Sequence, residues 1–212
     1  MSCSIVSVSS APRNAVTHTP GRQPCVFFDR DGVFNTTDGF VNSPEDLDRQ
    51  LMPQAVEALA RLSRETEAKL VLVTNQGGVG YGKMTPQQAE AILERLEERV
   101  EAAGGHFDAI YYCPNRKDEQ APDGQVSARK PEAGMFYAAA HDFGSSIDLA
   151  DSYMVGDMTT DIAAGENSTR DMTTILLDTG MGGKDGHANV PADQHFADLS
   201  AAVDWLIPQL KR

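Results

Sequence analysis

The sequence predicts an α/β fold in which a parallel β-sheet lies between two layers of helices. Three observations predict this fold. Short apolar runs recur along the 212 residues, amphipathic segments separate them, and polar residues gather where the runs end. Parallel strands need a long crossover that is usually a helix, so this alternation favours a sheet that is covered on both faces.

Five short apolar runs are predicted as buried strands, because each is rich in apolar residues and stops at polar or Gly residues. These runs are residues 24–28, 69–73, 107–112, 152–155 and 173–177. Glycine-rich residues 180–190, which follow the last run, are expected to form a mobile loop that borders the site. The two faces of a sheet formed by such strands must be covered by other elements.

Five segments with apolar residues at helical spacing are predicted as helices that cover the sheet. They are residues 54–64, 86–103, 135–141, 161–166 and 198–206. The second has the clearest start, because Thr85 offers an N-cap and Pro86 occupies the first helical position. Two glycines follow its end. The strands and helices alternate along the chain, as a parallel sheet requires.

One domain is expected over residues 24–212, preceded by a flexible extension at residues 1–23. The extension is rich in Ser, Thr and Pro, and it lacks the apolar stretch of a secretory signal. No apolar run approaches the roughly 20 residues of a membrane-spanning helix, and the three cysteines are scattered. These features predict a cytoplasmic protein that has no membrane partner, and we expect it to be a monomer.

The charge of the chain argues against nucleic acid as a partner. The formal net charge is −13 at pH 7, and no basic block appears in the sequence. Proteins that bind nucleic acid draw most of their affinity from Lys and Arg side chains that neutralise phosphates. An acidic protein can still bind one small phosphate through a local cation and a metal ion, so a small-molecule partner is expected.

Polar side chains follow four of the predicted strands or the loops behind them, and ligands bind at this edge of an open parallel sheet. The residues are Asp29, Asp31, Thr74, Asn75, Lys130 and Asp157. Any one of them alone is typical of a turn or a helix cap. Together they indicate a site.

The pair Asp29 and Asp31 is suited to phosphoryl transfer, which needs a nucleophile, a proton donor for the leaving oxygen and cations for the phosphoryl oxygens. A carboxylate is already ionised near neutral pH, so Asp29 is the candidate nucleophile. Asp31 is the candidate acid and base. Gly32 allows the backbone to turn sharply and approach a phosphate.

Four motifs in order resemble those of the haloacid dehalogenase-like (HAD-like) phosphatases, over about residues 24 to 180. They are Asp29-x-Asp31-Gly32-Val33, Thr74, Lys130-Pro131 and Gly156-Asp157-x-x-x-Asp161. The resemblance implies a Rossmann-like fold and a phosphatase that uses Mg²⁺ and forms an aspartyl-phosphate. Little chain is left between the motifs once helices and strands are assigned, so no large cap domain is expected.

The resemblance also implies a role for each motif residue. Asp29 would be the nucleophile and a magnesium ligand, Asp31 would be the acid and base and offer its backbone carbonyl to the metal, and Thr74 would hold a phosphoryl oxygen. Lys130 would neutralise charge, Asp157 would bind Mg²⁺ directly, and Asp161 would support the metal site. Asn75, Arg129 and Asn35 are the expected substrate-binding residues.

Within the capless branch, further strings are similar to those of D-glycero-D-manno-heptose 1,7-bisphosphate phosphatases and, less closely, of histidinol-phosphate phosphatases. They include Gly39-Phe40-Val41, Tyr111-Tyr112-Cys113-Pro114 and Arg129-Lys130-Pro131-Glu132. The expected substrate is therefore a small phosphorylated metabolite such as heptose 1,7-bisphosphate. Histidinol phosphate or another small metabolite is an alternative. A macromolecular phosphatase, acting on nucleic-acid 3′-ends or phosphoproteins, and a non-catalytic binding module are the others.

Two departures from the heptose phosphatases concern zinc and substrate charge. Those enzymes usually hold a structural zinc, but here only Cys113 matches a ligand position, and the other three positions hold Asn115, Val126 and Ala128. One thiol cannot form a closed zinc site, so no zinc is expected. Tyr81 stands where an arginine is expected, which removes one cation near a second substrate phosphate. His187 is expected to be a surface or structural residue.

Overall fold

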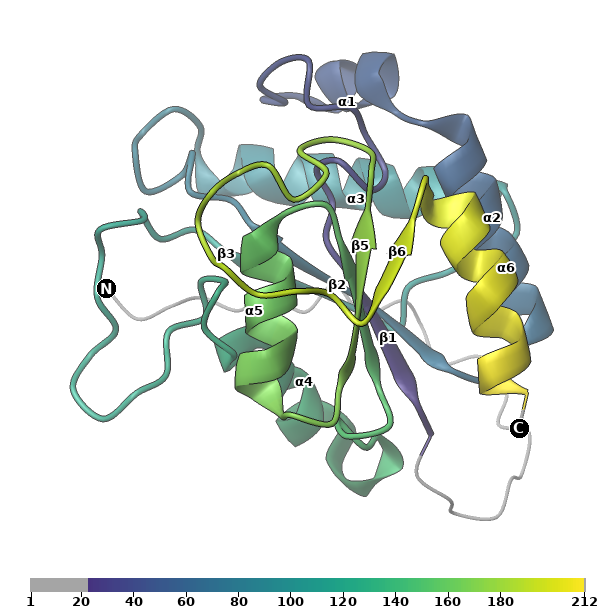
Figure 1. Cartoon of the computed structure of the whole chain (residues 1–212). Coiled ribbons are helices and arrows are strands. Elements are labelled where there is room, and N and C mark those ends of the chain that lie inside the picture. Colours follow the sequence, from purple (N-terminus) through teal and green to yellow (C-terminus); the bar gives the residue numbers. More distant parts are fainter. Residues whose placement is uncertain (1–22, 212) are drawn as a thin grey trace.

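We describe the fold from a computed structural model of the chain, which places residues 23–211. The expected N-terminal extension, except for Gln23, lies outside the described residues. A six-stranded parallel sheet forms the centre, in the order β3-β2-β1-β4-β5-β6 (Figure 1). The strands are β1 (Cys25–Phe28), β2 (Lys69–Asn75), β3 (Ala109–Cys113), β4 (Tyr153–Gly156), β5 (Thr173–Leu177) and β6 (Gln194–Phe196). The predicted α/β fold is confirmed.

The strand order reverses at β1. From β1 the chain proceeds to β2 and β3 in one direction, and it then returns to the other side of β1 for β4, β5 and β6. The register pairs Phe28 of β1 with Leu72 of β2 on one side and with Val155 of β4 on the other. Such a reversal opens a crevice beyond the carboxyl ends of the two strands that flank it, here β1 and β4.

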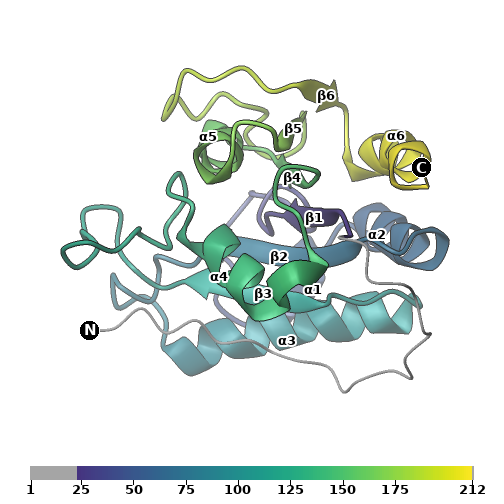
Figure 2. The same cartoon turned by 90° about the horizontal axis from the view of Figure 1, so that it is seen from below.

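Helices cover both faces of the sheet (Figures 1 and 2). They are α1 (Pro44–Gln50), α2 (Pro53–Glu65), α3 (Pro86–Ala102), α4 (Gly134–Phe143), α5 (Thr159–Ser168) and α6 (Leu199–Leu210), with a short 3₁₀ turn at Gly144–Ser146. Helices α2, α3 and α6 pack on one face, and α4 and α5 pack on the other. None of the helices described in residues 23–211 has the length and hydropathy needed to span a lipid bilayer.

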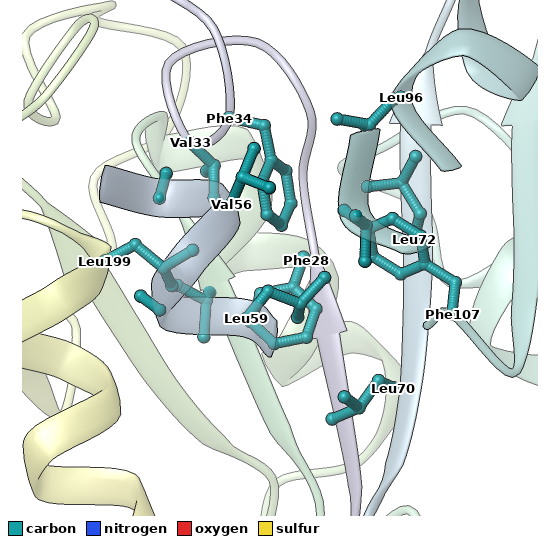
Figure 3. Close-up of a cluster of buried hydrophobic side chains, with 14 of the residues drawn as sticks. Phe28, Val33, Phe34, Val56, Leu59, Leu70, Leu72, Leu96, Phe107 and Leu199 are labelled. Carbon is teal, nitrogen blue, oxygen red and sulfur yellow. The ribbon is translucent and has the colours of Figure 1, made fainter. Parts of the chain in front are cut away.

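Two hydrophobic cores result from the alternation of side chains along each strand. In β1, Val26 and Phe28 point into the core beneath α2, α3 and α6, whereas Cys25 and Phe27 point toward α4 and α5. Figure 3 shows the larger core, in which the Phe34 ring lies with its centre 5.9 Å from that of Phe28. Burial of each such side chain contributes roughly 1.5–3 kcal/mol, so the strand that carries Asp29 is firmly held.

The structure adds two elements that the sequence pattern did not predict, α1 and β6. Helix α1 buries only Leu47, so it shows little apolar periodicity, although Ser43 caps its start by accepting a hydrogen bond from the Asp46 amide at 3.2 Å. Strand β6 is three residues long and lies at the sheet edge, where His195 is exposed. Within residues 23–211 there is no large cap domain.

Candidate active site

The two central strands bring their terminal carboxylates together. Asp29 follows β1, and its amide donates to the Val155 carbonyl of β4 at 2.9 Å, which ties the first loop to the neighbouring strand. Asp157 follows the end of β4, and Asp161 lies in the first turn of α5. One oxygen from each of Asp29, Asp157 and Asp161 lies within 4.8 Å of the others. We call these three residues the acidic cluster.

Lys130 inserts its ammonium group into the acidic cluster. Its Nζ lies 2.7 Å from Asp29 Oδ1 and 2.7 Å from Asp161 Oδ1, and it donates to the Val73 carbonyl at 2.8 Å. The side chain is buried, so these contacts replace its hydration. Burial lowers the pKa of Lys130, but the charges of Asp161 and Asp29 outweigh burial and raise it, which keeps the amine protonated.

Asn75 holds the backbone of Lys130 in place. The Asn75 side chain donates to the Lys130 carbonyl and accepts from the Lys130 amide, both at 3.0 Å. The same asparagine lines the cavity described below, together with Arg129. Asn75 thus fixes the position of the lysine, in addition to facing the space where a substrate would bind.

Asp31 lies beside the acidic cluster in a separate hydrogen-bond network. Arg30 Nη2 donates to both of its carboxylate oxygens, at 2.7 and 2.8 Å, and Asn35 Nδ2 donates to Oδ1 at 3.0 Å. Burial raises the pKa of Asp31, but the Arg30 charge and the hydrogen bonds from Asn35, Arg30 and Gln76 outweigh burial, and the pKa is lowered. In this arrangement Asp31 is a carboxylate. No role was predicted for Arg30 from the sequence.

Thr74 lies fully buried near the end of β2, where its hydroxyl contacts the Gln76 side chain. Gln76 Nε2 donates to Thr74 Oγ1 at 2.9 Å and lies 3.5 Å from Asp31 Oδ2. Gln76 therefore links the second motif to the first. Its place two residues after Thr74 was the available signal, but no role was predicted for it.

The acidic cluster carries more negative charge than Lys130 compensates. Burial is the main cause that raises the pKa of Asp157 to about 8, and the charge of Asp29 adds to it against a hydrogen bond from the Met181 amide. Burial likewise raises the pKa of Asp29 to about 6, with Lys130 opposing it and Asp161 and Asp31 adding to it. A bound divalent cation would favour the ionised form of both groups.

The donor set fits Mg²⁺. Asp157 Oδ2 accepts from the Met181 amide at 2.6 Å, whereas Asp157 Oδ1 is buried and has no hydrogen-bond partner among residues 23–211. A buried carboxylate oxygen of this kind requires a cation or another donor. Hard carboxylate oxygens are the ligands that Mg²⁺ prefers in proteins. The expected metal ligands Asp29 and Asp157 therefore lie together, with Asp161 beside them.

Two glycines leave room for the Asp157 carboxylate. Gly32 has φ +76°, and a Cβ at this position would lie 2.3 Å from Asp157 Cγ. Gly180 has φ +59°, and its Cβ would lie 2.1 Å from Asp157 Oδ2. Both positions combine a left-handed backbone with a close approach, and other residues fit neither.

The glycine-rich loop after β5 borders the site, as expected, and hydrogen bonds hold it there, whereas its mobility stays a prediction. In addition to the Met181 contact, the Gly183 amide donates to the Asp157 carbonyl at 2.8 Å. Asp185 accepts from the Thr159 amide and from the Thr159 hydroxyl, both at 2.7 Å. The loop thus closes over the N-terminal turn of α5. The glycines of this loop have positive φ angles and allow the turns that these contacts need.

A cavity of about 790 Å³ lies against the site. Its wall includes Lys130 and Asn75 from the site, Arg129, and residues of the loop between β3 and α4. Arg129 orders this loop, because its Nη1 donates to the Asn115 carbonyl at 3.0 Å. The volume is in the range of sites for small molecules.

The metal-ligating residue types gather at one place in the described chain. Within residues 23–211, the acidic cluster is the group of three or more His, Cys, Asp or Glu side chains that could hold a metal ion. Cys113 is buried in β3 and does not belong to such a group. The expectation that the protein binds no zinc stays a prediction.

Known proteins are similar to this chain in both sequence and fold. The family described as "Polynucleotide kinase 3 phosphatase" matches residues 24–209. The chain belongs to this family of haloacid dehalogenase-like phosphatases. It is therefore a phosphatase, an enzyme that hydrolyses phosphoric monoesters, as the motifs predict.

The relatives of this phosphatase include enzymes named as heptose 1,7-bisphosphate 7-phosphatases. The D-glycero-D-manno-heptose-1,7-bisphosphate 7-phosphatase of Thermosynechococcus vestitus is 38% identical over 202 residues, which cover 89% of this chain and 97% of the relative. The D-glycero-beta-D-manno-heptose-1,7-bisphosphate 7-phosphatase of Vibrio cholerae is 38% identical over 74% of this chain and 83% of its own.

A solved structure agrees with these sequence relatives. The D,D-heptose 1,7-bisphosphate phosphatase of B. bronchiseptica, complexed with magnesium and phosphate, superposes with a TM-score of 0.74 at 31% identity. The match covers 88% of this chain and 99% of that protein. A haloacid dehalogenase-like phosphatase of the same fold thus binds the metal and the anion that the acidic cluster and the cavity are suited to bind.

Proposed function

We propose that this phosphatase hydrolyses heptose 1,7-bisphosphate, or a closely similar small phosphorylated metabolite, with Mg²⁺ and through a phosphorylated Asp29. The observation that carries the proposal is the acidic cluster around Lys130, because Lys130 also lines a cavity of about 790 Å³. The named relatives support the heptose substrate, since they are similar over most of their own length.

Asp29, Asp157 and the backbone carbonyl of Asp31 would hold Mg²⁺, with Asp161 in support. The bound ion would supply positive charge to the phosphoryl oxygens. Lys130 would add a second positive charge, because it already contacts Asp29 at 2.7 Å. Thr74 would donate its hydroxyl to a phosphoryl oxygen, and Arg129 would bind the sugar or a phosphate from the cavity wall.

Asp29 would attack phosphorus with the oxygen that Lys130 does not contact. Asp31 would give a proton to the leaving oxygen and later accept one from the attacking water. The Arg30 contact favours ionised Asp31, so donation requires this contact to open. Release from the Arg30 charge moves the pKa of Asp31 upward, and enclosure by substrate adds to the effect.

Cytoplasmic action by a monomer completes the proposal, with one domain at residues 24–212. Cys25 is a buried free thiol, which fits a reducing compartment. Asn35 would act through Asp31, to which it donates at 3.0 Å. Asn75 would act through Lys130.

The test is the variant Asp29→Asn, which keeps the size of the side chain and removes the nucleophilic charge. We expect kcat for heptose 1,7-bisphosphate and for p-nitrophenyl phosphate to fall at least about 10³-fold, with an unchanged circular dichroism spectrum. Wild-type protein should lose activity on both substrates when Mg²⁺ is chelated. A folded variant that retains the wild-type rate would exclude the aspartyl-phosphate mechanism.

A phosphatase for nucleic-acid 3′-ends is the second candidate function, because the family description names polynucleotide 3′-phosphatases. The net charge of −13 opposes it, since a polyanion is repelled by an acidic protein.

A further inference from the structure

One pair of side chains in the cavity wall has no part in the proposed chemistry. Lys117 belongs to the loop between β3 and α4, and His187 belongs to the loop between β5 and β6. Both are exposed and both line the cavity whose wall also contains buried Lys130. The cavity therefore connects the catalytic lysine to two nitrogen-bearing side chains at its outer rim.

The two side chains meet across the rim. Lys117 Nζ lies 3.4 Å from His187 Nδ1, although the residues are 70 positions apart in the sequence. An ammonium group can only donate, so Nδ1 is the acceptor in this contact. Neither side chain forms an ion pair with a carboxylate anywhere in residues 23–211. The two ammonium protons that this contact leaves over and the second ring nitrogen thus gather at one rim.

Each of the two loops is held by a hydrogen bond close to the pair. The Lys117 amide donates to the Tyr81 hydroxyl at 3.3 Å. The His187 amide donates at 3.4 Å to Asp185 Oδ2, and Asp185 is itself bound to Thr159 of α5. Tyr81 occupies the position where an arginine is expected. Tyr81 offers no positive charge, but it supports the loop that carries Lys117.

We infer that Lys117 and His187 form a second phosphate-binding site, which holds the phosphate of a bisphosphate substrate that is not cleaved. Ammonium and imidazole N–H groups are strong donors to phosphate oxygens. Two acidic side chains, Glu119 and Glu132, lie in the same wall. One carboxylate oxygen of Glu119 accepts a hydrogen bond from the Arg116 amide at 3.4 Å. The inference rests on the proposed function and names the residues that would give specificity for a bisphosphate over a monophosphate.

Two substrates that differ only in this phosphate separate the second site from the catalytic one. Heptose 1,7-bisphosphate and heptose 7-phosphate both carry the phosphate that is cleaved, and only the first carries a phosphate on C1. In Lys117→Met we expect KM for the bisphosphate to rise about tenfold, the loss of one charge-assisted contact, with kcat unchanged. In His187→Gln the rise should be about threefold to tenfold.

The controls are heptose 7-phosphate and the variant Lys184→Met. KM for heptose 7-phosphate should change less than about twofold in every variant, as expected for surface changes that touch no substrate group. Lys184 is exposed in the same loop as His187 but does not line the cavity, so its variant matches the charge change of Lys117→Met. It should leave both KM values unchanged.

The outcomes distinguish this inference from the proposed function. If the variants change KM equally for both heptose phosphates, or for neither, or if Lys184→Met has the same effect as Lys117→Met, the second site is excluded while the phosphatase proposal stands. If wild-type protein with Mg²⁺ hydrolyses p-nitrophenyl phosphate but neither heptose phosphate, the proposed substrate and the second site are excluded together.

Discussion

At the scale of single residues, the acidic cluster depends on a position that has no side chain. Gly32 follows the two aspartates of the first motif, has φ +76°, and lies where a Cβ would come within 2.3 Å of Asp157 Cγ. The position of Asp157, a proposed magnesium ligand that is distant in the sequence, is therefore controlled from the first loop. This contact can be tested separately from backbone strain.

In Gly32→Ala, we expect kcat/KM to fall at least about 100-fold, because displacement of a reacting or metal-binding group by about 1 Å has this cost. Affinity for Mg²⁺ should fall as well, measured by calorimetric titration. Gly124→Ala is the control, since Gly124 has φ +79° but open space around its Cβ. It should lose about 1 kcal/mol of stability and no activity. Equal losses of activity in both variants would contradict the argument.

Lys130 is the second residue with a decisive role, because it is the cation that the buried carboxylates share in this structure. In Lys130→Met we expect the free energy of unfolding without Mg²⁺ to fall by about 3–5 kcal/mol, the cost of leaving buried charges without their partner. Saturating Mg²⁺ should raise Tm more in the variant than in the wild type, since the site has lost one positive charge. Activity should fall at least about 100-fold.

Lys69→Met is the matched control for this prediction. Lys69 pairs with Asp108 at 2.8 Å, but its side chain is 30% exposed. Solvent screens such a pair, so the loss of stability should stay below about 1 kcal/mol, and the response to Mg²⁺ should equal that of the wild type. Thermal denaturation with and without Mg²⁺ measures both effects. If the two lysine variants lose the same stability, Lys130 does not compensate the cluster.

At the scale of elements, the loop between β5 and β6 joins α5 to the acidic cluster. In Asp185→Ala we expect faster hydrogen exchange at the Met181 and Gly183 amides, because Asp185 fixes the loop through Thr159. kcat/KM should fall about 10-fold to 100-fold, as for other residues that orient metal ligands. Mass spectrometry or NMR measures the exchange. Unchanged exchange with lost activity would show that Asp185 acts in another way.

Asp178→Ala provides the control for the same loop. Asp178 lies at the start of the loop, and its side chain contacts His195 of β6 on the surface at 2.8 Å. Loss of an exposed contact of this kind should change neither amide exchange at Met181 nor kcat/KM. A similar loss in both variants would indicate general loosening of the loop rather than the specific attachment to α5.

The sequence was sufficient to predict elements that are long or strongly patterned. Five strands and five helices lie where apolar runs and helical spacing placed them, and Thr85 does cap α3, accepting from the Gln88 amide at 3.2 Å. Helix α1 and strand β6 were not predicted. Helix α1 is anchored mainly by Leu47, and β6 is an edge strand of three residues. Short elements depend on tertiary contacts that local pattern does not contain.

The same distinction applies to the site. The motifs predicted the residues at the strand ends, because the carboxyl ends of parallel strands lie at one edge of the sheet irrespective of loop conformation. Gln76, Arg30 and Asp185 were not predicted to function, since each acts on a partner that another element supplies. Their importance is visible only when the distances are known. His187 was expected to be an ordinary surface residue, and only its place beside Lys117 suggests otherwise.

At the scale of the whole molecule, the fold brings buried carboxylates and the cation Lys130 together at one edge of the sheet. The protein as a whole has a net charge of −13, and its acidic cluster adds buried negative charge at the crevice between β1 and β4. In the proposed mechanism, binding of a phosphate would therefore depend on local cations, which include Lys130, Arg129 and the metal ion. A small dianion can be enclosed by these groups, whereas a long polyanion must also lie along the acidic surface.

This contrast gives opposite expectations for the two candidate substrate classes. At low ionic strength, we expect kcat/KM for a short 3′-phosphorylated DNA strand to be at least about 100-fold below that for heptose 1,7-bisphosphate, because the protein repels the polyanion. Added salt screens charges that are separated by more than about 10 Å at 0.1 M. At constant Mg²⁺, NaCl should therefore raise the rate on the DNA strand.

An enzyme built for nucleic acid shows the reverse, because salt weakens binding that releases counterions from phosphates. The control is p-nitrophenyl phosphate, which is small and reports any direct effect of NaCl on the acidic cluster. Rates on the DNA strand are therefore divided by rates on this substrate at each salt concentration. A ratio that falls with salt, together with efficient removal of the 3′-phosphate, would favour the polynucleotide substrate over the heptose, and a ratio that rises from a low value supports the enclosed small-molecule site.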